Sequence, residues 1–324
     1  MTVHPDEVAI RRATGDDEPA VQSLVGSVMG WGDGPAAARM WRWKHHQNAS
    51  GPSPTWLACG AGGRLLGVRT FLRWRFRLDG AERLAVRAVD TVTHPDARGH
   101  GLFRRLTLHG LRELEAEGVD FVFNTPNDQS RPGYLSMGWQ PVRQLTVAVQ
   151  PSGPRGGYRM ATNRVPAALE SAALTLGRPA TEAFDDDVCA ALADGQRIGL
   201  VTERDPSHLR WRYAGLPELG YRVLTLGVDP TEGVAVIRAR LRGAARELTV
   251  AELHAPTRRT ATRLVRLAIR GSGADFALSL PGADGRAGGV PVPRLGPLLV
   301  ARRVASSPPA AGCWRLSLGD VELF

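Results

Sequence analysis

The fold of this chain is decided by Val89-Asp90-Thr91-Val92-Thr93-His94-Pro95-Asp96-Ala97-Arg98-Gly99-His100-Gly101-Leu102-Phe103-Arg104-Arg105-Leu106. This stretch reads as a strand that runs into an Arg-Gly-x-Gly loop, and the loop opens directly onto a helix. Such a loop turns consecutive backbone N–H groups toward one point, where the helix N-terminus adds partial positive charge. Gly99 and Gly101 let the backbone approach an anion closely because they carry no Cβ. The stretch therefore predicts a seat for a pyrophosphate.

A second motif follows the predicted helix and the short apolar run 119–124, which predicts a buried strand. It contains Asn127, Tyr134, Gly138 and Trp139. Together the two segments resemble the GCN5-related N-acetyltransferases (GNAT). That family carries Arg/Gln-x-x-Gly-x-Gly/Ala after a strand, later an Asn, a Tyr seven residues on, and a Gly followed by an aromatic residue four further on. The resemblance implies an α/β fold with a mixed central sheet and a bound acyl-CoA.

The sequence departs from the family pattern at two positions. Phe103 stands where the loop motif ends on a small residue, so the first helical turn must accommodate a ring near the cofactor. Pro132 lies two residues before Tyr134, and proline is tolerated only in the first turn of a helix. We therefore expect a short helix that starts near Arg131.

The bulk properties describe an ordinary globular protein with room for two domains. The chain has 324 residues, of which 43% are hydrophobic and 23% charged. It has no apolar run of membrane-spanning length and no basic-then-apolar leader, which favours a cytoplasmic enzyme. The three cysteines lie far apart without a His or Cys at metal spacing, so we expect neither a disulfide framework nor a metal site.

The net charge of +9 is carried almost wholly by arginine, because Lys44 is the only lysine. An arginine-rich chain with much Ala, Gly and Pro is what a GC-rich genome encodes. The arginines are dispersed rather than clustered in a run. This pattern agrees with an anionic cofactor and gives weak support for an RNA partner.

The apolar pattern predicts the order β-α-α-β-β-β-α-β-α-β over residues 1–150, which is one complete domain of the family. The predicted elements are strand 8–12, helices 16–28 and 35–47, strands 55–59, 65–77 and 84–93, helix 101–117, strand 121–124, a short helix to Met137, and strand 139–149. Residues 150–157 are rich in Pro and Gly and predict a linker.

Residues 158–324 repeat the first half faintly and predict a second, degenerate GNAT-like domain. Four segments recur in the same order: 43–44 in 211–212, 67–73 in 233–240, 90–95 in 251–256, and 120–126 in 275–281. The repeat has no glycine at residues 256–261, where the phosphate loop should be. We expect it to share the fold without binding CoA in this way. Its role is either to close one side of the acceptor pocket or to support the first domain.

Acyl transfer from a thioester to an amine needs a polarised carbonyl, loss of a proton from the amine and protonation of the leaving sulfur. The resemblance implies that free main-chain groups of Thr91, Val92 and Thr93 bind the pantetheine arm and the thioester oxygen. Tyr134 is the predicted general acid, because a phenol keeps its proton at neutral pH and can give it to a thiolate.

Asp90 is the predicted general base, acting directly or through water, and a structural or substrate-orienting carboxylate is the alternative. His94, His254 and Glu252 are further candidates for the base. The remaining residues that the resemblance assigns to the cofactor are Arg98, Gly99, His100, Gly101, Leu102, Phe103, Arg104 and Asn127. The cluster Trp41-Arg42-Trp43-Lys44-His45-His46 lies on the helix that borders the acceptor in relatives. The helical spacing of this segment favours Met40 and Trp43 as core residues.

The leading hypothesis is an acyl-CoA-dependent N-acyltransferase that uses acetyl-CoA or another acyl-CoA and no metal. It most simply transfers acetyl to a primary amine of a small molecule. One alternative is an amide-forming transferase that takes an aminoacyl group from tRNA, since tandem domains of this fold occur in such enzymes. The intact loop argues against it, because an aminoacyl-tRNA donor needs no pyrophosphate seat. Another alternative is a non-catalytic acyl-CoA sensor.

Overall fold

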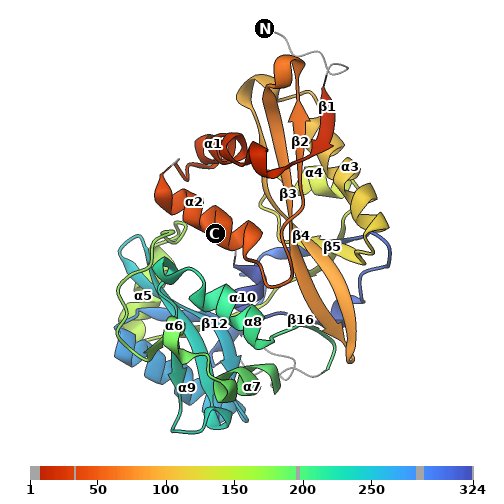
Figure 1. Ribbon diagram of the computed structural model, residues 1–324. Helices are drawn as coiled ribbons and strands as arrows, with labels where there is room; N and C mark the ends of the chain where they lie inside the picture. The colour runs from red at the N-terminus through yellow and green to blue at the C-terminus, as the bar shows by residue number, and fades with distance from the viewer. Residues whose placement is uncertain (1–7, 33, 195–197, 282–287, 323–324) are drawn as a thin grey trace. The chain divides into compact units, whose positions relative to one another are not determined.

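The computed structural model describes residues 8–32, 34–194, 198–281 and 288–322 (Figure 1). The chain divides into two compact units. Unit 1 consists of Met1–Phe76, Glu82–Val142 and Leu299–Pro309, and unit 2 of Arg77–Ala81, Arg143–Leu298 and Ala310–Phe324. The chain thus enters unit 2 after Val142, ahead of the expected linker, and a C-terminal segment returns to unit 1.

Unit 1 has the element order that the sequence predicts. Its elements are β1 (Ala9–Arg12), α1 (Glu18–Met29), α2 (Pro35–Trp41) with a π-helical turn (Arg42–His46), β2 (Thr55–Cys59), β3 (Leu65–Leu78), β4 (Ala81–Thr93), α3 (Leu102–Ala116), β5 (Phe121–Asn124), α4 (Arg131–Ser136) and β6 (Gln140–Gln144). The short helix α4 begins at Arg131 with Pro132 in its first turn, as expected.

The predicted strand 139–149 is wrong as a single element. It forms two strands, β6 and β7 (Val147–Pro151), and they belong to different sheets. The first sheet runs β1-β2-β3-β4-β5-β15-β6, where β15 (Leu298–Arg303) pairs antiparallel with β5. Strand β7 pairs antiparallel with β13 (Phe276–Ser279) of the second sheet. The first sheet therefore takes in β15 from the second half of the sequence, together with two short strands, β9 (Leu200–Thr202) and β16 (Trp314–Arg315). The second sheet takes in β7 from the first half.

Helices cover both faces of the first sheet. On one face, apolar residues of α1 and α2 pack on one residue from each of β2, β3 and β4: Val21, Leu24, Val25, Trp41, Leu57, Val68 and Val92. The α1 members follow the i, i+3, i+4 spacing of a helix with one apolar side. On the other face α3 approaches so closely that a Cβ at Gly110 would lie 2.9 Å from the Trp56 ring.

Unit 2 contains a second mixed sheet in the order β14-β7-β13-β12-β11-β10-β8. Its elements are α5 (Pro154–Thr162), β8 (Arg178–Pro179), α6 (Ala180–Ala183), α7 (Asp186–Asp194), β9 (Leu200–Thr202), α8 (Pro206–Leu209) with a π-helical turn (Arg210–Ala214), β10 (Arg222–Thr225), β11 (Val234–Arg242), β12 (Ala245–His254), α9 (Arg258–Ser272), β13, β14 (Val290–Val292), β16 (Trp314–Arg315) and α10 (Leu318–Val321). Because β7 and α5 occupy residues 147–162, the expected linker at 150–157 is structured.

The two units share a succession of elements, which agrees with a duplicated fold. In each, an antiparallel hairpin leads to a helix of 15 residues, α3 or α9, and then to a strand parallel to the hairpin's second strand. Each parallel ladder begins at a phenylalanine: Ala85 pairs with Phe121, and Glu247 with Phe276. A π-helical turn occurs in both.

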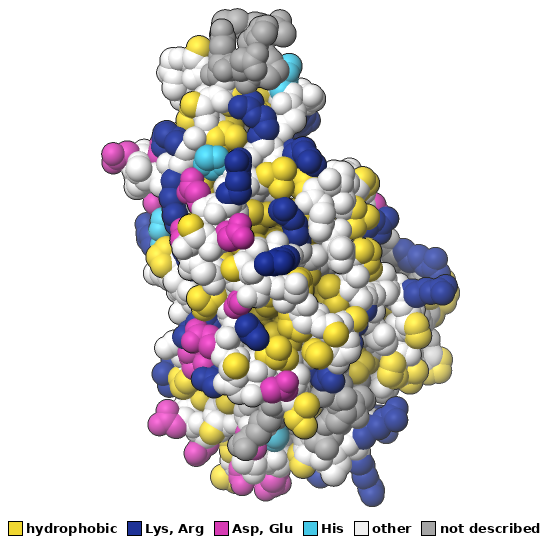
Figure 2. Space-filling model, turned by 90° about the vertical axis from the view of Figure 1, so that its right-hand side faces the viewer, with side chains coloured by type: hydrophobic (Ala, Val, Ile, Leu, Met, Phe, Trp, Pro, Cys, Tyr) yellow, Lys and Arg dark blue, Asp and Glu magenta, His cyan; other side chains and the backbone are white. Residues whose placement is uncertain are grey.

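The positive charge is spread over the surface. Figure 2 shows Lys and Arg side chains distributed over the visible face among apolar and uncharged residues. On this face the basic side chains are dispersed, as the sequence predicts. The described part of the chain holds no helix long and apolar enough to cross a membrane.

Candidate functional site

The site in unit 1 begins where β4 and β5 part. Their parallel ladder joins Ala85–Arg87 to Phe121–Phe123. In the register of these two described strands, pairing ends at Arg87, while β4 continues to Thr93. Thr91, Val92 and Thr93 thus lie beyond the ladder, on the part of β4 that leads into the glycine loop. Strand parting of this kind leaves main-chain groups available to a ligand.

The glycine loop has the geometry of an anion seat. Gly99 has φ of 83° and Gly101, the N-cap of α3, has φ of 69°, and both values lie in the region that side chains disfavour. No side chain caps the N-terminus of α3, and nothing lies within 4 Å of a Cβ built on either glycine. The N–H groups of the first turn thus have no side-chain cap, and the helix dipole favours negative charge beside them.

The side chains of the loop divide between solvent and core. Arg98 and Arg104 are exposed, His100 is half-buried and Leu102 is buried. Arg104 donates a hydrogen bond from Nη1 to the Ser136 carbonyl at 3.0 Å. Both arginines lie beside the open loop and can contribute to binding a phosphate.

Phe103, the departure from the family pattern, packs on α4. Its ring contacts Gly133 so closely that a Cβ there would lie 2.9 Å from Phe103 Cε1. The same ring meets Tyr134 edge-on, with the centroids 5.3 Å apart. Because Gly133 of α4 has no side chain, it leaves room for the Phe103 ring.

Tyr134 is buried, with 5% exposure, and its hydroxyl contacts a cation. Arg69 on β3 is fully buried and donates from Nη1 to Tyr134 Oη at 3.0 Å, and the same nitrogen contacts Thr91 Oγ1. Since Arg69 uses one lone pair of the hydroxyl, the Tyr134 proton is left to point at another acceptor. Arg69 is not among the site residues predicted from the sequence, although its position as an arginine within the apolar run of β3 is a signal for it.

Asn127 shapes the turn between β5 and α4. Its Oδ1 accepts hydrogen bonds from the backbone N–H and the hydroxyl of Ser130, both at 2.9 Å. These contacts fix the turn after β5.

Asp90, the predicted base, lies in a buried ionic cluster. Its carboxylate is 2.8 Å from Lys44 Nζ and 2.7 Å from His45 Nε2, and all three residues are at most 7% exposed. Burial opposes ionisation of Asp90, but Lys44 and His45 outweigh it and lower the pKa of the carboxyl to about 2. Asp90 also has φ of 43°, an uncommon conformation for a residue with a side chain.

The other candidate bases have different surroundings. His94 lies in the loop after β4, where its Nδ1 accepts from the Asp96 N–H at 3.2 Å. Glu252 is buried in unit 2, and its carboxylate binds Arg204 Nε at 2.9 Å and the Tyr213 hydroxyl at 2.5 Å. His254 closes β12. The structure thus brings Asp90 together with Lys44 and His45, whereas Glu252 and His254 belong to unit 2.

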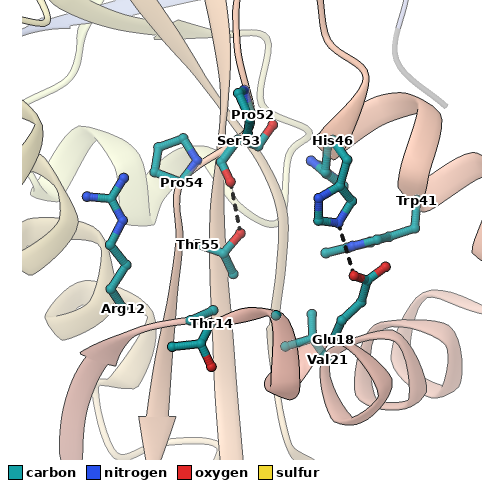
Figure 3. Close-up of a pocket in the computed structure, with 13 residues that line it drawn as sticks. Arg12, Thr14, Glu18, Val21, Trp41, His46, Pro52, Ser53, Pro54 and Thr55 are labelled. Carbon is teal, nitrogen blue, oxygen red and sulfur yellow. Dashed lines mark hydrogen bonds and ion pairs between the residues drawn. The ribbon is translucent and has the colours of Figure 1, made fainter.

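A cavity of about 260 Å³ lies against the same cluster within unit 1 (Figure 3). Its lining includes Glu18, Trp41, His45, His46, Ser53 and Thr55. Figure 3 shows the His46 ring pointing at the Glu18 carboxylate, with Nε2 3.3 Å from Oε2. His45 therefore lies between this cavity and Asp90. Among the described residues, no three His, Cys, Asp or Glu side chains are placed to hold a metal ion.

Comparisons with known proteins agree with this geometry. Residues 9–142 match the family model of the acetyltransferase (GNAT) domain. The chain is similar to a GCN5-related N-acetyltransferase from Anabaena variabilis, at 13% identity and a TM-score of 0.61 over 92% of this chain and 73% of that one. A probable N-acyltransferase from Enterococcus faecalis gives 12% identity and a TM-score of 0.61 over 92% and 72%.

A further similar structure is Saccharomyces cerevisiae N-myristoyltransferase with bound myristoyl-CoA. It gives 10% identity and a TM-score of 0.55 over 92% of this chain and 85% of that one. No curated protein matches the sequence. At these identities the structural likeness shows the fold, and it extends over most of the chain.

Proposed function

We propose that this protein, whose residues 9–142 form a GNAT acetyltransferase domain, transfers an acyl group, most simply acetyl, from CoA to a primary amine of a small molecule. The observation that carries the proposal is the uncapped N-terminus of α3 behind two left-handed glycines. That arrangement is an anion site by its physical chemistry, and the diphosphate of an acyl-CoA is the anion that a GNAT domain takes.

The residues present fit an acyl-CoA. The N–H groups of residues 99–103 would hold the diphosphate, with Arg98 and Arg104 beside the phosphates. The main chain of Thr91, Val92 and Thr93 would hold the pantetheine arm and the thioester oxygen, and Asn127 shapes the turn next to them. The cofactor supplies an electrophilic thioester carbon.

Tyr134 is the proposed general acid. Its proton goes to the CoA sulfur as the carbon–sulfur bond breaks, so that a thiol leaves rather than a thiolate. The contact from Arg69 supports this role, because it occupies the hydroxyl oxygen as an acceptor and leaves the proton to be donated. Asp90 lies on the opposite face of β4 from Thr91, and we assign it to the removal of the amine proton.

A paired glycine substitution tests the loop. Gly101→Ala adds a Cβ at a left-handed position next to the seat, which strains the backbone by about 1–2 kcal/mol. Gly62→Ala is the matched control, because Gly62 also has positive φ, at 66°, and open space around it, but lies in the turn before β3. We expect the first change to weaken acetyl-CoA binding about tenfold or more and the second to leave it unchanged.

Isothermal titration with acetyl-CoA measures both variants, and thiol release over a panel of primary amines measures transfer. No binding by the unsubstituted protein at millimolar acetyl-CoA would contradict the proposal. Binding without thiol release for any amine would point instead to an acyl-CoA sensor. RNase treatment of the assay separates a CoA-dependent reaction from one that uses aminoacyl-tRNA.

A further inference from the structure

His45 is held in one ring orientation by Asp90. Its Nε2 lies 2.7 Å from Asp90 Oδ2, inside a cluster that Lys44 completes. A carboxylate that is ionised can only accept, so Nε2 carries the shared proton. The other ring nitrogen, Nδ1, then holds the free lone pair. This is the arrangement by which a carboxylate fixes the tautomer of a histidine that works as a base.

Nδ1 of His45 is a buried acceptor that the protein leaves open. Among the described residues, none offers it a hydrogen-bond partner. Burial lowers the pKa of His45, so the ring is neutral at physiological pH and able to take up a proton. A buried polar atom without a partner is costly, and its presence calls for a reason such as a ligand or a catalytic role.

Unit 2 contains a contact at the same place in its fold, but a tyrosine that cannot accept a proton takes the place of the histidine. Counting along the parallel ladders from Ala85 and Glu247, Glu252 takes the position of Asp90. The π-helical turns Arg42–His46 and Arg210–Ala214 place Tyr213 in the position of His45. Burial raises the pKa of Tyr213, so it stays a donor, to Glu252 at 2.5 Å.

The surroundings of the two contacts also differ. A Cβ at Gly319 would overlap the Tyr213 hydroxyl, so the C-terminal residues close the site in unit 2. His45 instead borders the cavity of about 260 Å³. The contact between turn and strand is therefore shared architecture, whereas a neutral imidazole beside open space is particular to unit 1.

We infer that His45, oriented by Asp90, accepts the proton that the acceptor amine must lose; the inference rests on the function proposed above. Asp90 directly precedes Thr91 on β4, so the residue that binds the imidazole is the chain neighbour of the proposed thioester site. The ammonium gives a proton to Nδ1, and the neutral amine attacks the thioester carbon. The carbon–nitrogen bond forms and the carbon–sulfur bond breaks. The sulfur takes the Tyr134 proton, the second amine proton restores Tyr134, and His45 releases its proton to solvent.

The charged groups around the ring come from four elements. Asp90 faces it from β4, and Lys44 and His46 belong to its own turn. Glu18 of α1 and Arg12 of β1 line the cavity. Lys44 and His46 disfavour protonation of His45, and Asp90 favours it. Glu18 is already paired with His46, so Asp90 is the carboxylate that governs His45.

The pH dependence of kcat/KM for an alkyl monoamine tests the inference. If a neutral His45 takes a proton from the ammonium, kcat/KM is level between the pKa of His45 and that of the amine, and falls below the former. His45→Gln keeps an N–H for Asp90 and removes the base. In that variant only the free amine reacts, so kcat/KM should rise about tenfold per pH unit. At pH 7 the loss should be on the order of 10²-fold, with acetyl-CoA affinity unchanged.

A hydrazide of the same carbon skeleton is the second acceptor, because it is unprotonated at neutral pH. It should lose less than about tenfold in His45→Gln. His46→Gln, which alters the neighbouring histidine in the same cavity, should keep the level profile. A profile that rises tenfold per unit in the unsubstituted protein would overturn the inference even if the variant does not fold. Equal losses of kcat/KM with both acceptors in His45→Gln would also overturn the inference, while leaving the proposed function in place. No turnover with any amine would overturn the proposed function and the inference together.

Discussion

The change Tyr134→Phe separates the chemistry of the hydroxyl from its packing. Phenylalanine keeps the ring contacts to Phe103 and Trp139, whose centroids lie 5.3 and 5.1 Å away. Only the hydroxyl oxygen is lost, and with it the acceptor 3.0 Å from Arg69 Nη1. Arg69 Nη1 also contacts Thr91 Oγ1, so the nitrogen keeps a partner. We expect the free energy of unfolding to fall by about 1.5–2 kcal/mol, the lower part of the usual range for a hydrogen bond to a charged group.

Turnover should fall on the order of 10²-fold, while the Kd for acetyl-CoA stays within about twofold. Thiol release gives the first quantity, isothermal titration the second, and urea unfolding the loss of stability. Tyr158→Phe is the matched control, because that side chain is 69% exposed, and it should change none of the three. Unchanged turnover together with the expected loss of stability would refute the general-acid role and leave Tyr134 as a partner that only positions Arg69.

Two further changes test the charges and caps of the fold. Asp90→Asn removes the negative charge 2.8 Å from the buried Lys44 Nζ and should lower the free energy of unfolding by about 3–5 kcal/mol at pH 7. The pKa of Asp90 in the folded protein, about 2, lies below its ordinary value, so its contribution to stability is present above about pH 4 and lost as pH falls toward 2. In urea unfolding, the difference in unfolding free energy between the unsubstituted protein and Asp90→Asn should therefore shrink by about 2 kcal/mol over that interval. A difference that does not depend on pH would contradict this role of Asp90. Thr257→Ala removes the hydroxyl that accepts from the Thr260 N–H at 3.0 Å and should cost about 1 kcal/mol in urea unfolding, with acetyl-CoA affinity unchanged.

The first half of the fold is predictable because its signals are local. Gly99 and Gly101 mark a loop that needs left-handed backbone, and the apolar spacing of Val21, Leu24 and Val25 marks one side of a helix. Pro132 fixes where α4 begins, as the sequence predicts. Each of these statements depends on residues within one element, which is why periodicity and turn chemistry suffice.

The exchange of strands is not predictable in this way. Strands β6 and β7 are separated by Leu145 and Thr146 alone, and the sequence indicated one continuous strand there. Their partners, β15 and β13, lie more than a hundred residues further along the chain. Nothing in a short apolar run states which of two similar sheet edges it will join.

The ionic cluster of Lys44, His45 and Asp90 could not be predicted from helical periodicity either. A spacing of 3.6 residues buries one side of a helix, and it favours Met40 and Trp43 as core residues. The structure has a π-helical turn at Arg42–His46, which buries Trp43, Lys44 and His45 in succession. Wider turns of this kind are frequent at functional sites. This turn brings a lysine and a histidine to Asp90 together, which a regular helix would not do.

The contrast between the units supports the proposal that the chemistry takes place in unit 1. In unit 2 the N-terminus of α9 is capped by Thr257, and Glu252 is surrounded by donors from Arg204, Tyr213 and Ser317. In unit 1 the N-terminus of α3 has no side-chain cap, and Nδ1 of His45 has no partner among the described residues. Groups left open in this way cost free energy in the empty protein, and a bound ligand recovers it. We therefore expect acyl-CoA to stabilise unit 1 in thermal unfolding and to leave the polar contacts of unit 2 unchanged.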